Sequence, residues 1–332
     1  MGADHARTLH RAVSGADVVA VFDADPSRAA RVSAECGLAP TAAEAFGLIA
    51  DRSIDAVLVA TPDETHAALV LACIAGDKPV LCEKPLAATL DECRAIMAAE
   101  IAAGRRLVQV GFMRRFDPGY GAMKRSLGEG RLGLPLFMHC VHRNAVAPHF
   151  ITSDLVITNS TVHEIDAARW LLDDEFAAAT VVTPRRPRGI EGRAPQFVVL
   201  ESRSGVVVDI EAFLDAGYGY DVRAELVCER GTISLAPAPP TLQRYAGLEG
   251  FRVEEDWRAR FAAAYRHELQ AWVDSMGAGM PTGSSAWDGY AAAVTAEGCL
   301  SALRSGTKTK VDLEPRPDFY RPPALAGTGH AT

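Results

Sequence analysis

Between Asp17 and Gly111 the chain alternates short apolar runs with alanine-rich amphipathic segments, and this alternation constrains the fold more than any other feature. A strand buried on both faces is a short continuous apolar run, and helices must cover both faces of a parallel sheet. The expected strands are Val18–Phe22, Ala56–Ala60, Val80–Cys82 and Leu107–Val110, and the expected helices are Pro26–Cys36, Thr41–Ala50, Glu64–Ala75 and Leu90–Ala103. The pattern predicts an α/β domain built from βα units.

After Gly111 the apolar runs become longer and alternate with polar residues, which is typical of a mostly antiparallel, open sheet. The expected elements are a helix at Ser160–Leu172, strands at Ala177–Thr183, Gln196–Ser202, Val206–Leu214 and Val222–Glu229, and helices at Trp257–Met276 and Ala286–Ser305. We therefore predict a nucleotide-binding α/β domain over residues 1–111 and an α+β domain over 112–314, whose sheet has one face free for helices or another subunit. Residues 315–332, rich in Pro, Gly and Ala, are predicted to form a loose tail.

Composition argues against several partners. The net charge is -8 and the chain has no block of basic residues, so its surface offers little to a nucleic acid backbone or an anionic membrane. No stretch approaches the ~18 apolar residues of a spanning helix, and Met1–Val13 lacks the apolar core of an export signal. The seven cysteines are widely spaced, without a CxxC pair or a zinc-like histidine cluster. We expect a cytoplasmic protein with reduced thiols and no metal.

Asp23 ends the apolar run Val18–Phe22. In a dinucleotide-binding fold, an acid at this position accepts hydrogen bonds from the ribose hydroxyls of the adenosine. It would also repel a 2'-phosphate, which favours NAD over NADP. Alternatively, Asp23 only ends a strand or caps the helix that starts at Pro26.

The first strand and the glycine-rich turn of such a fold should precede that run, but the chain opens directly on Met1-Gly2-Ala3-Asp4-His5. Gly2 fits the last glycine of the turn, which allows a helix to pack closely on a strand. The first strand is normally central in the sheet. If it were missing, the strands on either side of it would keep buried backbone groups without hydrogen-bond partners. We expect the natural polypeptide to begin about a dozen residues earlier.

Several segments resemble the Gfo/Idh/MocA oxidoreductases. Thr61-Pro62-Asp63-Glu64-Thr65-His66 resembles the loop after the third strand of that family, and Cys82-Glu83-Lys84-Pro85-Leu86 resembles its EKP motif. Further segments resemble the inositol 2-dehydrogenase branch of the family, namely Gly111–Tyr120, His142–Asn144, Gly219–Arg223, Ala264–Leu269 and Ser285–Tyr290. These matches occur in the family's order and extend over nearly the whole chain.

The resemblance makes residues 1–111 a Rossmann-type NAD-binding domain and residues 112–314 the substrate-binding and oligomerisation domain. It also implies a homotetramer, assembled through the open sheet, that oxidises the axial hydroxyl of myo-inositol to a ketone with NAD. It makes Lys84 the EKP lysine between nicotinamide and substrate, and His163 the catalytic histidine. The implied cofactor contacts are Gly2, Asp23, Thr61, Pro62, His66, Glu83 and Lys84. The implied substrate contacts are Lys84, Met113, Arg114, Asn144, Asn159, Ser160, His163, Asp166 and Tyr220.

One position departs from the family pattern. The inositol enzymes of the family usually have an aspartate four residues before the histidine, where this chain has Asn159. If Asn159 and His163 are both helical, their i,i+4 spacing places the two side chains on one face. An asparagine can hold an imidazole tautomer but supplies no charge. We therefore expect a lower pKa for His163 with weaker catalysis, or a shifted substrate preference.

The chemistry explains these residue types. Oxidation of an alcohol needs a base with a pKa near neutral at the hydroxyl, which histidine provides, and an ammonium such as that of Lys84 stabilises the developing alkoxide and relays the proton. Taken singly, His163 could be an ordinary helix histidine, Lys84 a surface loop residue, and Arg114-Arg115 a solvated pair. Asp23, Lys84 and His163 occurring together, in this order, favour the functional interpretation.

Two hypotheses follow. The first is an NAD-dependent dehydrogenase for myo-inositol, another inositol isomer such as scyllo-inositol, or an aldose ring. The second is a non-catalytic homologue that binds a sugar or a protein partner, which the missing first strand and Asn159 favour. The retention of Lys84, His163 and Asp166 disfavours it.

Overall fold

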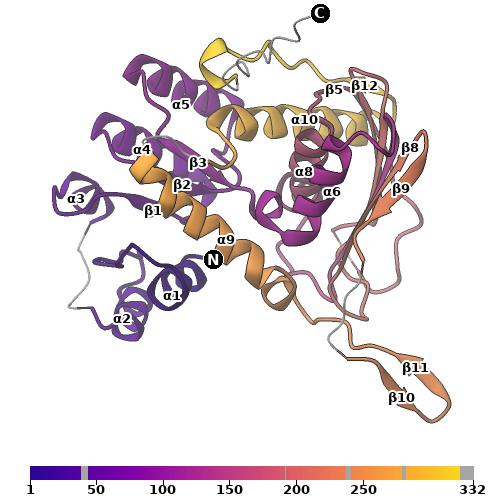
Figure 1. Cartoon of the computed structure of the whole chain (residues 1–332), viewed down its shortest axis with the longest axis horizontal. Helices are drawn as coiled ribbons and strands as arrows, with labels where there is room; N and C mark the ends of the chain where they lie inside the picture. The colour runs from indigo at the N-terminus through magenta and orange to yellow at the C-terminus, as the bar shows by residue number, and fades with distance from the viewer. Residues whose placement is uncertain (39–43, 191, 237–240, 279–281, 322–332) are drawn as a thin grey trace, which may run out of the picture.

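The computed structural model describes residues 1–38, 44–190, 192–236, 241–278 and 282–321. The N-terminal part contains a parallel sheet with the order β1-β2-β3, formed by β1 (Val57–Val59), β2 (Val80–Glu83) and β3 (Val108–Gly111). Its helices are α1 (Gly2–Ala12), α2 (Pro26–Glu35), α3 (Ala45–Ala50), α4 (Asp63–Ala75) and α5 (Leu90–Ala103) (Figure 1). Every residue of β2 and β3 is buried, as expected for apolar strands covered on both faces.

The strand predicted at Val18–Phe22 is not formed, and that prediction was wrong. The segment joins α1 to α2 without pairing with any strand in the described part of the chain, and Val19 is 59% exposed. A strand requires a hydrogen-bonded neighbour, so an apolar run alone does not create one. Of the helix predicted at Thr41–Ala50, the described portion contains α3, while residues 39–43 lie outside the described residues.

The C-terminal part contains a seven-stranded sheet with the order β12-β5-β6-β7-β4-β8-β9. Its strands are β4 (Pro135–Arg143), β5 (Phe176–Val182), β6 (Gln196–Ser202), β7 (Val207–Phe213), β8 (Asp221–Cys228), β9 (Gly231–Ser234) and β12 (Thr309–Lys310). All neighbouring strands are antiparallel except β4 and β7, which are parallel. The prediction of a mostly antiparallel sheet is therefore confirmed, and the sheet is mixed because it contains one parallel pair.

Strand β4 shows how this sheet is covered on one face only. Met138, Cys140 and His142 are buried, whereas His139 is half exposed and contacts Asp209 of β7. Cys140 and His142 therefore lie on the covered face of β4, and His139 lies on the other. Helices α8 (Val162–Leu172) and α10 (Ala286–Ser305) cover the inner side of the sheet (Figure 1).

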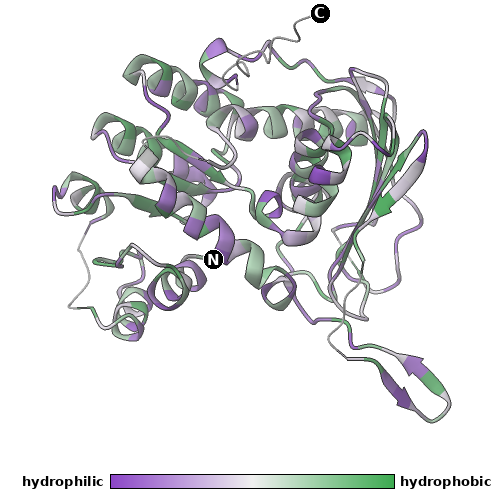
Figure 2. Ribbon diagram, viewed as in Figure 1, coloured by the Kyte–Doolittle hydropathy of each residue, from purple (hydrophilic) through white to green (hydrophobic). Residues whose placement is uncertain are grey.

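Two long helices connect the parts of the molecule. Helix α9 (Trp257–Ala278) contacts α1 and the 3-10 helix η1 (Met113–Phe116), and α10 contacts α5, α8 and β5. Figure 2 shows hydrophobic residues along β1 and α4, and every residue of β2 and β3 is buried. The domain boundary at 111/112 stays a prediction, because α9 and α10 follow it in the sequence yet pack against elements of both parts.

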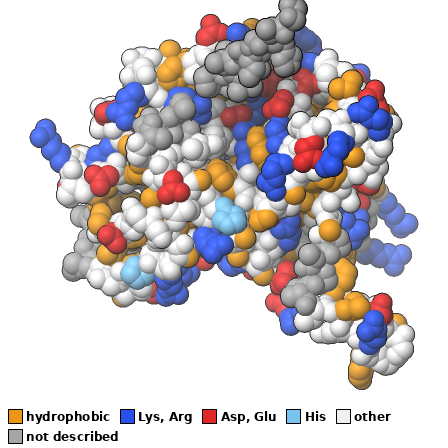
Figure 3. Space-filling view, viewed as in Figure 1, with side chains coloured by type: hydrophobic (Ala, Val, Ile, Leu, Met, Phe, Trp, Pro, Cys, Tyr) orange, Lys and Arg blue, Asp and Glu red, His pale blue; other side chains and the backbone are white. Residues whose placement is uncertain are grey.

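The remaining elements are α6 (Pro118–Gly128), α7 (Ser153–Leu155), the π-helix η2 (Val156–Thr161), η3 (Asp318–Tyr320) and the hairpin of β10 (Gln243–Tyr245) and β11 (Leu248–Gly250). The hairpin projects from the body (Figure 1) and carries exposed hydrophobic side chains (Figure 3). The predicted loose tail needs a correction, since Tyr320 is buried and its hydroxyl donates to Glu100 of α5 at 2.6 Å. Residues 322–332 of that tail lie outside the described residues.

Among the described helices, none has the length and apolar character needed to cross a membrane. In the same described part of the chain, no group of His, Cys, Asp and Glu side chains is arranged to hold a metal ion. All seven cysteines are buried free thiols.

Candidate active site

Lys84 follows β2 directly, at the carboxyl edge of the parallel sheet, where α/β proteins bind their ligands. His66 of α4 joins this loop to the loop after β1. Its Nδ1 lies 2.7 Å from the Pro85 carbonyl oxygen and its Nε2 lies 2.9 Å from that of Thr61. The structure therefore brings together Thr61, Pro62, His66 and Lys84, which the sequence assigned to one cofactor site.

A buried pair that sequence reasoning missed lies beneath this loop. The Nε2 of His5, on α1, is 2.7 Å from Oε1 of Glu83. Burial raises the pKa of Glu83, but the hydrogen bond and charge of His5, together with the charge of Lys84, outweigh it and hold that pKa below its usual value. The other oxygen of Glu83 accepts from the Lys84 backbone N–H at 3.2 Å. The available signal was a histidine on the inward face of a helix that starts at Gly2.

Asn159 lies in the π-helix η2 and contacts Lys84 rather than His163. The Lys84 ammonium donates to the Asn159 backbone oxygen at 2.9 Å and to its side-chain Oδ1 at 3.3 Å. A π-helical turn is wider than an α-helical one, so residues four apart no longer lie directly above each other. The expectation that Asn159 orients the imidazole is therefore not met, and Asn159 orients the lysine. Ser160 is buried in the same turn.

His163 lies in the first turn of α8, with its ring edge-to-face against Phe112 at 6.2 Å between centroids. Its Nδ1 is buried and has no hydrogen-bond partner among the described residues. Burial lowers the pKa of His163 well below its usual value, and the positive charges of Lys84 and Arg114 lower it further. The direction agrees with the sequence expectation, but burial is its main cause.

Arg114 and Met113, predicted to contact the substrate, are both buried in η1. The Arg114 guanidinium donates to Glu164, whose oxygens also lie 3.0 Å from Nδ1 of His142. This buried cluster lies directly next to His163 in the chain, because Glu164 is the following residue.

Asn144 and Tyr220 flank that cluster. Tyr220 places its ring edge-to-face against His142, with 6.0 Å between centroids. Asn144 comes two residues after His142, past the end of β4, and its Oδ1 is buried without a partner among the described residues. An unpaired buried amide oxygen is costly, so it is available to a ligand donor.

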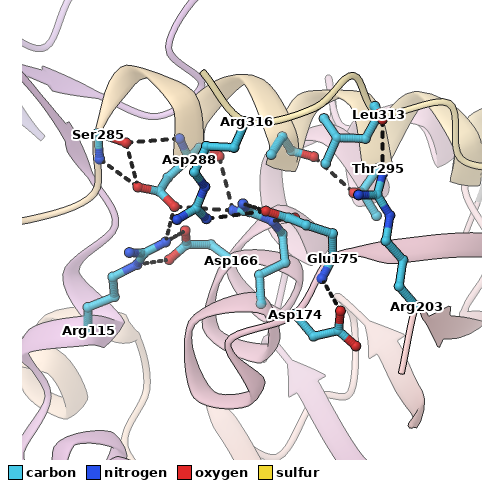
Figure 4. Close-up of polar contacts among 12 residues, drawn as sticks. Arg115, Asp166, Asp174, Glu175, Arg203, Ser285, Asp288, Thr295, Leu313 and Arg316 are labelled. Atoms are coloured by element: carbon cyan, nitrogen blue, oxygen red, sulfur yellow. Dashed lines mark hydrogen bonds and ion pairs between the residues drawn. The ribbon is translucent and has the colours of Figure 1, made fainter. Parts of the chain in front are cut away.

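Asp166, predicted to contact substrate, is instead fully buried in an ion-pair network (Figure 4). Its two oxygens accept from Nε and Nη2 of Arg115 at 2.9 and 2.6 Å. The same arginine pairs with Asp288 of α10 at 3.0 Å. Arg169 continues the network, because it pairs with Asp288 and with Glu175, and Glu175 also pairs with Arg316. Asp166 therefore fixes α8, which carries His163, against η1 and α10.

The cofactor end shows which acid caps α2. Asp25 is the cap, accepting from the Ser27 N–H at 2.9 Å, while Asp23 accepts from the Asp25 N–H at 2.9 Å. The alternative of Asp23 as the helix cap is therefore wrong. Helix α1 begins at Gly2 without a side-chain cap, and an ideal Cβ on Gly2 would lie 3.6 Å from Ala60 Cβ. The free N–H groups of an uncapped helix start can donate to a pyrophosphate, and the Asp23 carboxylate can accept from ribose hydroxyls. Together with the Lys84 loop they fit a nicotinamide dinucleotide.

A nucleotide-binding α/β domain whose lysine loop meets a histidine-bearing helix of a second, sheet-containing part defines the class of nicotinamide-dependent oxidoreductases. Comparison with known proteins narrows this class. Residues 1–112 match the family model described as oxidoreductase family, NAD-binding Rossmann fold, and residues 120–234 match the GFO/IDH/MocA C-terminal domain. The chain belongs to the Gfo/Idh/MocA oxidoreductase family.

Similar proteins extend the match over almost the full length. Inositol 2-dehydrogenase 2 of Saccharopolyspora erythraea is 53% identical over 97% of this chain and 96% of its own length. Inositol 2-dehydrogenase of Burkholderia vietnamiensis is 45% identical over the same shares. The crystal structure of myo-inositol dehydrogenase from Lactobacillus casei, in complex with NAD(H) and myo-inositol, has a TM-score of 0.93 at 34% identity and covers 97% of this chain and 96% of its own.

Proposed function

We propose that this protein is an NAD-dependent inositol 2-dehydrogenase that oxidises myo-inositol to 2-keto-myo-inositol. The observation that carries the proposal is the meeting of Lys84, at the edge of the NAD-binding sheet, with the η2–α8 segment that carries Asn159 and His163. The relatives that share almost the full length of this chain are inositol 2-dehydrogenases.

The reaction removes a hydride from carbon and a proton from oxygen. NAD, when bound, supplies the hydride acceptor. We assign the proton to His163, whose low pKa keeps its imidazole unprotonated and ready to accept. Lys84 donates to the substrate oxygen and stabilises its developing negative charge. Burial lowers the pKa of Lys84, which lets the lysine exchange a proton more readily than a surface lysine does.

The polyol pocket is proposed to include Asn144, Asn159, Ser160 and Tyr220, with Met113 as an apolar wall. Asn144 and Asn159 offer amide groups that can both donate and accept, which suits a ring bearing hydroxyls. Arg114 stabilises the residues next to this pocket, because it donates to Glu164, which also contacts His142. Asp166 is left out of the proposed substrate contacts, because Arg115 occupies both of its oxygens.

Steady-state reduction of NAD by the purified protein tests this proposal, with myo-inositol, scyllo-inositol and glucose compared at equal concentration. We expect kcat/KM to be highest with myo-inositol. A higher kcat/KM with another ring would change the proposed substrate but would still support a dehydrogenase. Tight NAD binding by calorimetry without reduction by any of the three rings would contradict the proposed activity, and calorimetry with myo-inositol would then test the non-catalytic sugar-binding alternative.

We further propose that the protein is a cytoplasmic homotetramer assembled through the outer face of the seven-stranded sheet. Large apolar side chains on and beside that face are exposed, namely Leu134, Leu136, Phe137, Val182 and Phe197. Exposed apolar patches of this kind mark interfaces. Light scattering of the wild type and of Phe197→Glu tests the interface, and a wild-type monomer would contradict it. The buried free thiols support a reducing compartment.

A further inference from the structure

The segment from Asn144 to Asn159 carries a proposed pocket asparagine at each end. Between them the chain leaves β4, turns, and enters η2 by way of α7. The side chains of Val146 and Phe150 are 75% and 72% exposed. Ala147, Ile151 and Val156 of this segment are buried with Ala212 and Leu214 in a small cluster that is separate from the main core. Because these apolar contacts are few, polar attachments of the loop are needed to fix the position of Asn144.

Arg193 holds this loop with every donor it has. Its Nε and Nη2 donate to the two oxygens of Asp215 at 2.6 and 2.7 Å. The remaining N–H groups reach three loop carbonyls, with Nη2 donating to Ala147 at 3.3 Å and Nη1 donating to Pro148 at 3.3 Å and Ile151 at 3.4 Å. A guanidinium has five N–H donors in a fixed planar fork, and here all five are used.

Asp215 completes the attachment on the sheet side. It accepts from the Ala147 N–H at 3.2 Å, and the residues after it bind the start of the loop. The N–H of Ala216 donates to the Asn144 carbonyl at 2.8 Å, and that of Gly217 donates to Ala145 at 3.0 Å. The Arg193 and Asp215 side chains are both largely buried, so their ion pair is weakly screened by water.

We propose that Arg193 is a positioning residue for the polyol pocket, fixing residues 145–152 so that Asn144 keeps its place beside the substrate ring. Asn159, which binds Lys84, lies beyond the carbonyls that Arg193 reaches. This inference rests on the proposed function, because the pocket does. Arg193 touches neither Lys84 nor His163, so it acts on substrate affinity and leaves the chemical step and NAD binding in place.

Arg193→Lys is the informative variant, because it keeps the charge for Asp215 but cannot reach three carbonyls with a planar fork. We expect KM for myo-inositol to rise about tenfold, since small displacements of binding groups are costly. We expect kcat to change by less than about twofold and KM for NAD to stay at the wild-type value. Arg230→Lys is the matched control, because Arg230 also donates to loop carbonyls, those of Arg131 and Gly130, away from the pocket.

An unchanged KM for myo-inositol in Arg193→Lys would overturn the proposal, as would parallel changes in kcat and in both KM values. If the lysine variant does not fold, Asp215→Asn replaces it, since an asparagine still accepts from the Ala147 N–H. The activity of the wild-type protein with myo-inositol tests the proposed function, independently of any Arg193 variant. Hydrogen exchange of residues 145–152 tests the clamp whether or not inositol is the substrate, and wild-type exchange rates in Arg193→Lys would refute it.

Discussion

The ammonium of Lys84 is bound twice by Asn159, through the backbone oxygen at 2.9 Å and the side-chain Oδ1 at 3.3 Å. Both acceptors are neutral, so this lysine has no carboxylate in direct contact from the η2 turn. Its pKa is lowered mainly by burial, against the raising effects of Glu83 and Asp63. The amide at position 159 therefore adds no negative charge beside Lys84 and His163.

Asn159→Asp is expected to raise the turnover of myo-inositol by roughly threefold to tenfold, because a stronger general base removes the proton faster. The new carboxylate would raise the pKa of His163, which burial and the charges of Lys84 and Arg114 now lower. The acid limb of the kcat profile should accordingly move to higher pH. Turnover that is unchanged or lower, with an unmoved acid limb, would contradict this role for position 159.

Lys84→Met is expected to lower kcat by about 10²–10³-fold, since the group that stabilises the developing alkoxide is lost. Calorimetric affinity for NAD should change little, because Thr61, His66 and the start of α1 remain. Lys308→Met, which removes an exposed lysine paired with Glu201, serves as control and should retain wild-type kcat. Loss of NAD affinity in Lys84→Met equal to its loss of turnover would argue for a purely cofactor-binding lysine.

The elements that the sequence predicted well are those that need only local contacts, or that can pair with any neighbouring strand. The run Val80–Cys82 is buried on both faces, and pairing with any neighbouring strand would stabilise it as a strand. Lys84 follows this strand and therefore lies at the sheet edge, as expected. The run Val18–Phe22 has the same apolar character but forms no strand, because pairing depends on a second segment that composition does not reveal.

The side-chain assignments show the same limit. Position in the sequence places Asp166 one helical turn after His163, but only the tertiary structure shows that Arg115 binds both of its oxygens. The π-helical turn at Asn159 likewise has no signature in local periodicity, so the i,i+4 argument pointed to the wrong partner. A histidine on the inward face of the first helix was visible in the sequence, but its pairing with Glu83, 78 positions away, was not.

Asp23→Ser is expected to raise KM for NAD about tenfold, the effect of losing one charge-assisted hydrogen bond. Activity with NADP should rise relative to NAD, because the 2'-phosphate no longer meets a like charge. Asp25→Ser is the matched control, since serine can still cap α2 and the change leaves Asp23 in place. A ratio of kcat/KM for NAD over NADP that stays at its wild-type value in Asp23→Ser would exclude the ribose role.

Asp288→Asn tests the ion-pair network that holds α8. Burial raises the pKa of Asp288, but the charges of Arg115 and Arg169 and the Ser285 hydrogen bonds outweigh it and depress that pKa strongly. A depressed carboxyl pKa adds stability above its ordinary value of about 4, and this stability is lost as the pH falls toward the folded-state pKa.

Removing one partner of a buried pair costs about 3 kcal/mol or more, so Asp288→Asn should lower the free energy of unfolding at pH 7 by about that amount. The difference from wild type should shrink below about pH 4, where the unfolded-state carboxyl becomes protonated. Urea unfolding at both pH values measures it. Asp312→Asn, at a surface ion pair with Lys310, should change stability by less than about 0.5 kcal/mol. Equal destabilisation of Asp288→Asn at neutral and acidic pH would show that shape, rather than charge, holds α8 against α10.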